Sequence, residues 1–533
     1  MLKQIGIDFN GEKLNAFTQK LVTLDCWGGY LNDVKSYHDL ETAINNRITS
    51  YRAYLNYNVD NLSQDIYSTK TLIGVPISQT VQLLKEFAII EEDTEIFIRI
   101  DQYEELAWLD ETSNGLGTSY REVIHKLLGM RDTNVSYRIG TRYFAWTGDE
   151  KMYGSAARLE KKRNYTEVSI DLVFKRPENQ RTWVFPEFAE DIFYRRMKLS
   201  SYKFNDKKDS LISRIFGTRL SPLETANIYV PNDKEKSISL EDNWPENWKL
   251  FLSELAHKNP LSARLGEAWA RQKKKGQIVN EQSWEEPLPW DEKKWWRKER
   301  VEQALMQIAS RNRQQLIWYG KDDLLGLSGG HILIFLSLCQ HIWDVWLRDK
   351  RNEVPDTELR IPTIDYVIQS AGIRETSSDW FEDISNEKGG KERKIFINYL
   401  GSMFYKKLVE DKAMSYPGWN GFSLTIEDLH KNNHINNFIS DACNYGDLYD
   451  APHTSKSKDK KPRRKLYIAP ILSPYFKIPY AHTKEPMYVD LNELATWLED
   501  CEIFDRRELN DVLLPKKLKN KSDVGNQGII DFE

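Results

Sequence analysis

The stretch IFIRIDQYEEL, residues 96–106, decides how the chain is interpreted. Its first half is apolar apart from Arg99, which is the composition of a strand in a largely buried sheet. Asp101 follows directly, at the point where such a strand is expected to leave the sheet. In open α/β proteins this edge carries the functional groups, so the stretch predicts a site at Asp101.

Two more carboxylates, Glu104 and Glu105, follow within a few residues. Asp101 in this position can hold Mg²⁺ through water, and either glutamate can orient a water molecule that attacks a phosphate. The alternative is a buried strand followed by an acidic helix N-terminus, which the helix dipole favours. The residue pattern by itself leaves both interpretations open.

The next elements extend this strand into a parallel α/β unit. Residues 120–131 predict a helix and residues 135–144 a second strand, and the order strand, helix, strand is typical of parallel pairing. Arg142 ends the second strand, where a guanidinium can contact phosphates at the same sheet edge. Arg138 is a weaker candidate for that role. The alternative is a surface arginine at a strand end.

A basic segment lies between predicted elements in the C-terminal part. Residues 441–472 predict the end of a helix, a loop, a basic tip and a returning strand, which is the outline of a winged helix. In that fold the tip can bind the phosphates of double-stranded DNA, whereas the alternative is a solvated flexible loop. The candidate residues are Lys456, Lys458, Lys460, Lys461, Arg463, Arg464 and Lys465.

Other regular segments predict two further strands and several helices. IGIDFN at 4–9 and VSIDLVF at 168–174 are the expected strands, the second because apolar and polar residues alternate. Residues 271–300 mix charges, prolines and tryptophans without one period, which indicates an insertion or linker. The expected helices include 188–199, 301–309, one that opens at SGG (328–330), 391–410 and 490–500.

The composition limits the class of protein. A length of 533 residues predicts about three or four domains, and 40% hydrophobic residues exclude wholesale disorder. The net charge of -5 gives no global attraction to nucleic acid, so any basic surface must be local. The four cysteines stand far apart, and neither a secretory signal nor a membrane span is recognisable. We therefore expect a cytoplasmic protein with no membrane contact.

The usual partner of such a strand, a phosphate-binding loop, is missing from the sequence. That loop has the pattern G-x-x-x-x-G-K-[ST], in which backbone amides and the lysine surround the phosphates. Gly-Lys occurs only at Gly320-Lys321 and Gly390-Lys391, and neither is followed by Ser or Thr. Neither has a glycine five residues ahead of it, and both come after the Asp101 strand. These 533 residues therefore contain no recognisable phosphate loop.

The order of these features resembles the bacterial AAA+ ATPases related to origin-recognition and Cdc-type initiator proteins, which border on signal-transduction (STAND) NTPases. IFIRIDQYEEL resembles the Walker B strand of that family and YRIGTRYFAW (137–146) the sensor-1 strand. The further similar segments are RLEKKRNYTEVSIDL (158–172), LSGGHILIFLSLCQHIW (327–343) at the start of the helical lid, and YIAPILSPYFKIPYAHTKEPMYV (467–489) in the C-terminal domain.

The resemblance implies a fold and a set of roles. The fold is α/β plus α, with an incomplete P-loop NTPase-type parallel sheet core, a helical lid and a C-terminal winged-helix-like domain. Asp101 would coordinate Mg²⁺, Glu104 or Glu105 would supply the catalytic carboxylate, Arg142 would be the sensor, and Gly330 would mark the nucleotide-contacting lid turn. The implied domains are 1–200 (core), 201–300 (insertion or linker), 301–355 (lid), 356–510 (winged-helix-like) and 511–533 (disordered tail).

The chain departs from the family pattern at three places. Walker A is absent, Gln102 occupies the position where many AAA+ proteins have the catalytic glutamate, and the lid helix begins without the arginine of initiator lids. Because the family's phosphate loop precedes a strand like IGIDFN, the chain is expected to start just after that loop. ATP and Mg²⁺ would then bind only with a partner protein or upstream segment that supplies Walker A.

Two functions remain open. The first is an ATPase-like, nucleotide-dependent switch that acts on DNA or a partner and can self-associate, with ATP hydrolysis dependent on an external phosphate loop. The resemblance implies a setting in phage defence or a mobile element. The second is a non-hydrolysing DNA-binding or scaffold protein that retains a degenerate ATPase fold.

Overall fold

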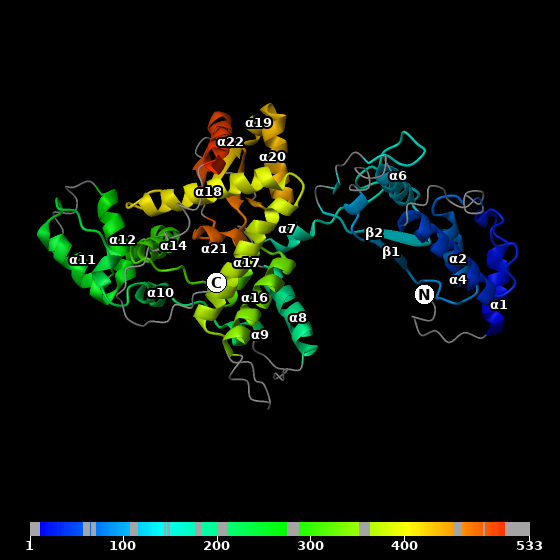
Figure 1. Ribbon diagram of the computed structural model, residues 1–533, viewed down its shortest axis with the longest axis horizontal. Coiled ribbons are helices and arrows are strands. Elements are labelled where there is room, and N and C mark those ends of the chain that lie inside the picture. The colour runs from blue at the N-terminus through cyan, green and yellow to red at the C-terminus, as the bar shows by residue number, and fades with distance from the viewer. Residues whose placement is uncertain are drawn as a thin grey trace. The chain divides into compact units, whose positions relative to one another are not determined.

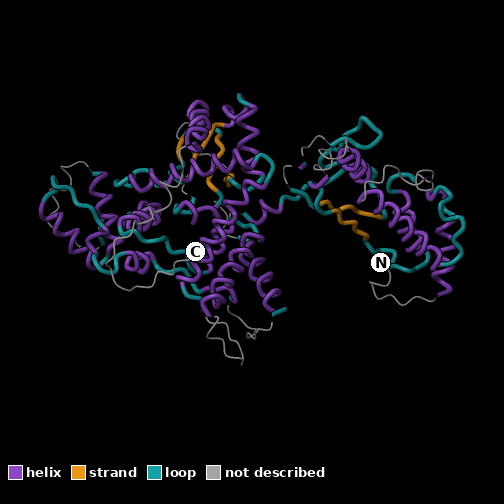
Figure 2. Tube along the Cα trace, viewed as in Figure 1, coloured by secondary structure: helices purple, strands orange, loops and turns teal. Residues whose placement is uncertain are grey.

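Two units, Met1–Val168 and Ser169–Glu533, make up the computed structural model. Helices dominate both, and the strands form two small sheets (Figures 1 and 2). None of the described helices combines the length and the apolar character that crossing a membrane requires. The residues that the structure describes are 11–56, 64, 71–106, 116–142, 145–146, 150–175, 183–200, 210–273, 287–350, 363–451, 461–482 and 485–506.

The first unit contains the predicted parallel pair of strands. Strand β1 pairs with β2 in parallel, from Ile96 opposite Val135 to Ile100 opposite Ile139, and α6 connects them. The prediction of a strand–helix–strand unit is therefore confirmed, whereas the strand expected at 4–9 lies outside the described residues. The elements are α1 (Gly11–Val22), α2 (Tyr37–Asn56), α4 (Val75–Glu86), β1 (Ile96–Ile100), α6 (Leu116–Gly129) and β2 (Val135–Ile139).

The second unit opens with a short helix where the sequence predicted a strand. Residues 170–174 form α7, and the Ser169 hydroxyl caps it by accepting a hydrogen bond from the Leu172 N–H. The strand prediction for 168–174 is wrong because alternation describes only one face of a segment. A strand also needs a neighbouring strand, and none of the described strands pairs with this segment. The N-terminal cap favours the helix instead.

Helices α10 to α14 have a hydrophobic core of their own. Trp248 and Trp290 are fully buried in it, with ring centroids 6.1 Å apart. Residues in the expected insertion or linker at 201–300 therefore form packed helices, although the expected domain boundaries stay predictions. The bounds are α8 (Phe185–Lys198), α9 (Leu211–Phe216), α10 (Pro222–Tyr229), α11 (Glu246–Lys258), α12 (Pro260–Gln272), α13 (Pro289–Glu292) and α14 (Lys294–Arg311).

The remaining elements surround a four-stranded mixed sheet with the order β4-β5-β3-β6. Strand β5 is antiparallel to both β3 and β4, and β6 is parallel to β3. The part of the chain that the structure describes is thus mostly helical α/β, with one small parallel sheet and one mixed sheet. The bounds are α15 (Lys321–Ser328), α16 (Ile332–Lys350), α17 (Tyr366–Asp383), α18 (Gly390–Glu410), β3 (Gly421–Thr425), α19 (Ile426–Lys431), α20 (Asn433–Asn444), β4 (Leu448–Ala451), β5 (Arg463–Ile468), α21 (Ser473–Phe476), β6 (Met487–Tyr488) and α22 (Leu491–Arg506).

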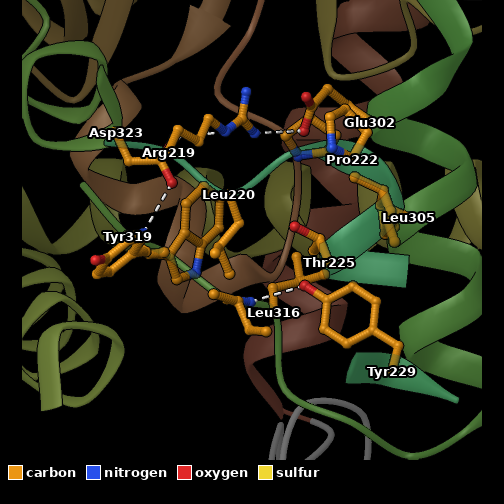
Figure 3. Close-up of a pocket in the computed structure, with 14 residues that line it drawn as sticks. Arg219, Leu220, Pro222, Thr225, Tyr229, Glu302, Leu305, Leu316, Tyr319 and Asp323 are labelled. Atoms are coloured by element: carbon orange, nitrogen blue, oxygen red, sulfur yellow. Dashed lines mark hydrogen bonds and ion pairs between the residues drawn. The ribbon is translucent and has the colours of Figure 1, made fainter. Parts of the chain in front are cut away.

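A small cavity lies where α10, α14 and α15 meet, and Arg219 crosses its rim (Figure 3). The Arg219 guanidinium pairs with Glu302 at 3.0 Å and with the buried Asp323 at 3.1 Å. Asp323 also accepts hydrogen bonds from the Tyr319 N–H and the Tyr480 hydroxyl. Burial raises the pKa of Asp323 to about 6. The charged cluster therefore ties together segments that are far apart in the sequence.

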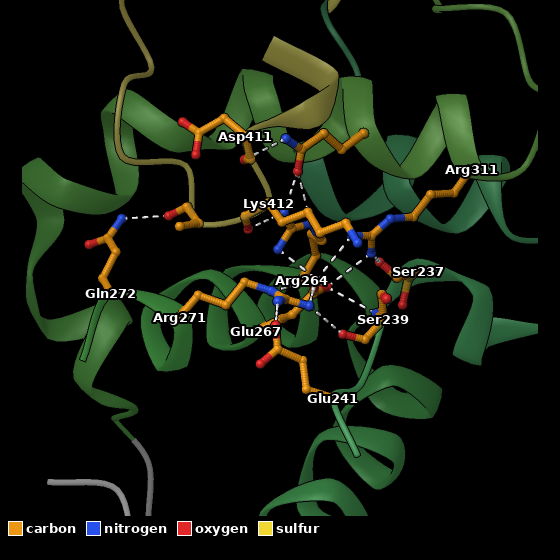
Figure 4. A network of polar contacts seen from close by, with 12 residues as sticks. Ser237, Ser239, Glu241, Arg264, Glu267, Arg271, Gln272, Arg311, Asp411 and Lys412 are labelled. Atoms are coloured by element: carbon orange, nitrogen blue, oxygen red, sulfur yellow. Dashed lines mark hydrogen bonds and ion pairs between the residues drawn. The ribbon is translucent and has the colours of Figure 1, made fainter. Parts of the chain in front are cut away.

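A second buried cluster centres on Glu267 of α12, which is 0% exposed (Figure 4). Its carboxylate lies 3.3 Å from the Arg264 guanidinium, 3.1 Å from that of Arg271 and 2.9 Å from that of Arg311. Burial lowers the pKa of Arg264 to about 10, which still leaves it protonated at neutral pH. One buried carboxylate thus pairs with three arginines, of which Arg264 is buried as well.

The same cluster holds the carboxyl end of α18. The Arg264 guanidinium donates to the Lys412 carbonyl at 2.7 Å, and the Gln307 amide donates to the Leu408 carbonyl at 2.6 Å. Arg300 of α14 donates to the Met414 carbonyl at 2.8 Å. Leu408 lies in the last turn of α18, where a helix carbonyl has no partner within the helix, and Lys412 and Met414 lie in the segment directly after the helix. These hydrogen bonds dock the α10–α14 helices onto the C-terminal part.

We expect Glu267→Gln to destabilise the second unit strongly, because it leaves the buried Arg264 guanidinium without its carboxylate and removes one ion-pair partner from Arg271 and from Arg311. Breaking a buried ion pair costs about 3–5 kcal/mol of unfolding free energy. Urea unfolding followed by tryptophan fluorescence measures this, since Trp248 and Trp290 lie in the adjoining core. Glu254→Gln, at an exposed site on α11, is the control and should have little effect. Equal stability of the two variants would contradict the central role of Glu267.

Candidate functional site

Asp101 lies directly after β1, and its carboxylate lies close to Gly140. The Asp101 carboxylate accepts a hydrogen bond from the Gln102 N–H at 2.9 Å. A Cβ atom at Gly140, directly after β2, would lie only 2.9 Å from the Asp101 Oδ1 atom. The absence of a side chain at Gly140 is therefore what makes room for this carboxylate. Sequence reasoning missed Gly140 because it predicted that the second strand continues to residue 144, whereas β2 ends at Ile139 and Arg142 lies in the loop after it. A glycine inside a predicted strand was the available signal.

Glu104 and Arg142 connect the loops that follow the two strands. The Glu104 carboxylate accepts a hydrogen bond from the Arg142 N–H at 3.2 Å and lies 3.6 Å from the Arg142 Nε atom. The Arg142 side chain remains 56% exposed. Glu105 is also exposed. The two glutamates that the sequence left as alternatives therefore have different surroundings, and Glu104 is the one that positions Arg142.

Tyr103 anchors the loop after β1 in the core of the first unit. Its hydroxyl lies 2.5 Å from the Nε2 atom of His125, and the His125 Nδ1 atom lies 2.7 Å from the Lys151 carbonyl oxygen. A carbonyl only accepts, so Nδ1 carries the proton and Nε2 accepts from Tyr103. Burial lowers the pKa of His125, which favours this neutral form. Trp146 packs against both rings. The sequence analysis missed this anchor.

Gly330 belongs to the second unit, in the turn between α15 and α16. Its backbone has a positive φ of 87°, which favours glycine. A Cβ atom there would lie 2.5 Å from the carbonyl oxygen of Phe174. That oxygen also accepts a hydrogen bond from the Trp183 indole at 2.8 Å. The described contacts of Gly330 are thus with the end of α7, and its nucleotide role stays a prediction.

The predicted basic residues fall into two groups. Lys456, Lys458 and Lys460 lie outside the described residues, and Lys461 is exposed beside them. The other three, Arg463, Arg464 and Lys465, lie on β5.

The three basic residues of β5 are held by the sheet to different degrees. Arg463 donates to the Ser423 carbonyl at 3.0 Å, and its guanidinium lies 4.5 Å from the Tyr488 ring centroid. Arg464 donates to Asp450 at 2.8 Å. Lys465 is only 5% exposed. These residues therefore support the base of the β4–β5 hairpin, whereas Lys461, which precedes β5, is exposed.

The donor set at Asp101 fits a Mg²⁺ ion that arrives with phosphates. In the described part of the chain no three His, Cys, Asp or Glu side chains form a group that could hold a metal. Nucleotide-bound Mg²⁺ needs only one or two carboxylates, because phosphate and water oxygens supply the other ligands. The cavity in Figure 3 is not an alternative nucleotide site, because its volume is about 40 Å³, whereas ligand pockets have about 300–1,000 Å³.

We expect the first unit to lose stability as the pH falls below the ordinary histidine pKa of 6.5. Because the folded state lowers the pKa of His125, its contribution is present above pH 6.5 and is lost as the pH falls toward the folded-state value. Thermal unfolding at pH 7.5 and pH 5, followed by tryptophan fluorescence, should show a larger loss for the wild type than for His125→Gln. His38→Gln, at an exposed site on α2, should behave like the wild type. An identical pH response in all three proteins would contradict a buried neutral His125.

Comparison with known proteins identifies the family. The ORC-CDC6-like family matches residues 3–488, which is nearly the whole chain. No curated protein and no solved structure matches the chain. The family generally binds ATP and Mg²⁺ and has an AAA+ fold, with which the two sheets are consistent. The resemblance to origin-recognition and Cdc-type proteins is thereby confirmed, and the chain belongs to the ORC-CDC6-like family of ATPase-like proteins.

Proposed function

We propose that the protein is a nucleotide-dependent switch in which Asp101 holds the Mg²⁺ ion of ATP and Arg142 contacts the phosphates. The bound Mg²⁺ supplies positive charge that polarises the phosphate oxygens. The observation that carries the proposal is the parallel pairing of β1 with β2, which places the residues after both strands at one sheet edge. Family membership supports the same chemistry. The setting that we propose from the resemblance is phage defence or a mobile element.

The two glutamates receive separate roles in this proposal. Glu104 positions Arg142, because it already binds the Arg142 backbone N–H and faces its guanidinium. Glu105 is exposed, and we assign it the orientation of the attacking water molecule. Gly140 is a positioning residue, since it leaves space for the Asp101 carboxylate. Gly330 keeps the nucleotide-contacting role that the family resemblance implies.

The phosphate-binding loop is proposed to come from outside these 533 residues, from a partner protein or from a further segment. The support is the absence of G-x-x-x-x-G-K-[ST] from the sequence. Asp101 and Arg142 can act on a phosphate only when other groups hold it beside them. We also propose that the protein can self-associate, which would not supply the loop because every copy has the same sequence.

We expect the 533-residue chain to hydrolyse ATP at background rate, and a phosphate-loop segment fused ahead of residue 1 to restore turnover. In the fusion, Asp101→Asn should lower kcat at least about 100-fold, because charge stabilisation at the phosphates is lost. Glu105→Gln should lower kcat with little change in nucleotide binding. Gly140→Ala should weaken Mg²⁺-dependent binding of a fluorescent ATP analogue, because its methyl group displaces the Asp101 carboxylate.

The matched control is Glu92→Gln, which removes an exposed carboxylate before β1 and should leave turnover unchanged. Turnover by the unfused chain that Asp101→Asn abolishes would contradict the proposal of an external loop. Turnover in the fusion that is insensitive to Asp101→Asn would contradict the assignment of the site itself.

We further propose that the C-terminal domain is winged-helix-like and binds double-stranded DNA with an affinity that depends on the bound nucleotide. The order of elements supports this: α18, β3, α19 and α20 precede the hairpin of β4 and β5, and β5 lies between β4 and β3. In that fold α20 would enter the major groove and the segment between β4 and β5 would contact phosphates. Lys461 and the lysines ahead of it are the proposed contacts.

We expect reversal of Lys456, Lys458, Lys460 and Lys461 to glutamate to weaken binding of a labelled 30-base-pair duplex at least tenfold. A plot of the logarithm of the DNA association constant against the logarithm of the salt concentration has a negative slope. The magnitude of this slope should decrease by up to about 0.9 for each phosphate that the protein no longer neutralises. Arg463 and Arg464 are left unchanged, because they support the sheet. Reversal of the exposed Lys294, Lys298, Lys391 and Lys406 gives the same net charge and is the control. An equal loss of DNA affinity in both variants would exclude a specific DNA contact by the segment between β4 and β5.

A non-hydrolysing DNA-binding or scaffold protein is the second candidate. The observation that favours it is Gln102, which occupies the position after Asp101 where many AAA+ relatives have a glutamate. Such a protein would bind DNA equally well with and without ATP, and the fused phosphate loop would restore no turnover. The two candidates therefore differ in the nucleotide dependence of DNA binding.

A further inference from the structure

The outer face of the β1–β2 sheet is exposed and carries an unusual set of side chains. Alternation places Phe97 and Arg99 of β1 and Ser136 and Arg138 of β2 on this face, and all four are exposed. Phe97 is 37% exposed. The opposite face carries isoleucines, valine and tyrosine, which are buried or half-buried. Parallel sheets normally have both faces covered, whereas the described side chains on this face are exposed.

Two like charges face each other across the strands in the free protein. Arg99 and Arg138 are directly opposite in the parallel register. Among the residues that the structure describes, neither guanidinium has an ion-pair or hydrogen-bond partner. Like charges opposite each other across two strands are destabilising. The arrangement therefore costs stability until an anionic group lies between the two guanidinium groups.

One of the two guanidinium groups is already fixed in place. Arg138 lies over the Phe97 ring, with the guanidinium carbon 3.8 Å from the ring centroid. This cation–π contact restrains a long side chain and presents an apolar ring edge beside a positive charge. Arginine and aromatic residues are the types that dominate the energetics of protein interfaces. The pair thus has the composition of an interface anchor.

Acidic residues at both ends of the face limit the kind of partner. Glu95 precedes β1 and Asp101 follows it, both exposed. Two acidic and two basic groups give this surface no net charge, so it offers no continuous track for the phosphates of a nucleic acid. The positive charge is confined to the centre. A partner must place its own negative charge there and carry an apolar group over Phe97.

We infer that this face is a docking surface for an acidic amphipathic helix of a partner protein. Carboxylates at positions i and i+4 of a helix have Cβ atoms about 5–6 Å apart. Neighbouring strands lie about 4.8 Å apart, which is the spacing that separates Arg99 from Arg138 along the sheet. One pair of helix carboxylates therefore matches the two arginines. An apolar residue one turn away covers Phe97. The inference needs no nucleotide, although Asp101 at one end of the face also belongs to the proposed ATP site.

The test uses the full chain without nucleotide or Mg²⁺ and a labelled 20-residue helical peptide with a leucine stripe bordered by glutamates. Fluorescence anisotropy should show binding that weakens with salt, and a peptide with lysine in place of each glutamate should bind at least tenfold more weakly. Arg99→Glu/Arg138→Glu should lower the affinity for the acidic peptide at least tenfold, and Phe97→Ala should also lower it. Lys20→Glu/Arg52→Glu, at exposed sites on α1 and α2, is the charge-matched control.

A second measurement tests the repulsion between Arg99 and Arg138 directly and requires no partner. Arg99→Glu alone places opposite charges across the strands, so the unfolding temperature of the free protein should rise. An unchanged or lower unfolding temperature would overturn the premise that Arg99 and Arg138 repel each other. Equal binding of the acidic and basic peptides, or equal weakening in the double variant and its control, would overturn the inference. Binding of a 20-nucleotide single-stranded DNA that the double variant abolishes, without binding of the acidic peptide, would assign the face to nucleic acid instead.

Discussion

Parallel hydrogen bonding between β1 and β2 is the constraint on which the candidate site depends. Because both strands run in the same direction, with Ile100 opposite Ile139, the residues that follow them emerge at one edge of the sheet. Asp101 lies beside Gly140 for this reason, and Glu104 joins the two loops by binding Arg142. Tyr103 fixes the first loop to the core through His125. Backbone pairing of β1 with β2 thus brings the two loops to one edge of the sheet, and the side chains of Glu104 and Tyr103 keep the loops in place.

Buried charge has a comparable role in the second unit. Glu267 accepts several guanidinium groups from α12 and α14, and Arg219 joins two carboxylates at the cavity between α10, α14 and α15. A buried ion without its partner is far more costly than an exposed one. These helices therefore cannot separate without leaving charges unpaired. A region whose sequence has no single period gains a defined arrangement in this way.

Much of the framework follows from local sequence. Periodicity predicted the places of both strands of the parallel pair and of the helices α6, α8, α14, α16, α18 and α22, although β2 ends at Ile139 and not at residue 144. The prediction failed for VSIDLVF, where Ser169 caps a helix and no described strand is available for pairing. It was also incomplete for the basic run, because charge along a sequence does not tell an exposed lysine from one that the sheet buries, such as Lys465.

The sequence by itself determined the residue types of the candidate site, the position of the Asp101 strand and the absence of a phosphate loop. These depend on hydrophobic periodicity and on motif spacing, which are local properties. Only the tertiary structure decided which glutamate faces Arg142, that Gly140 makes room for Asp101, and that Arg99 lies opposite Arg138. Each of those facts depends on strand register and on the direction of side chains from separate segments. Local sequence does not encode either one, because both arise when distant parts of the chain pack together.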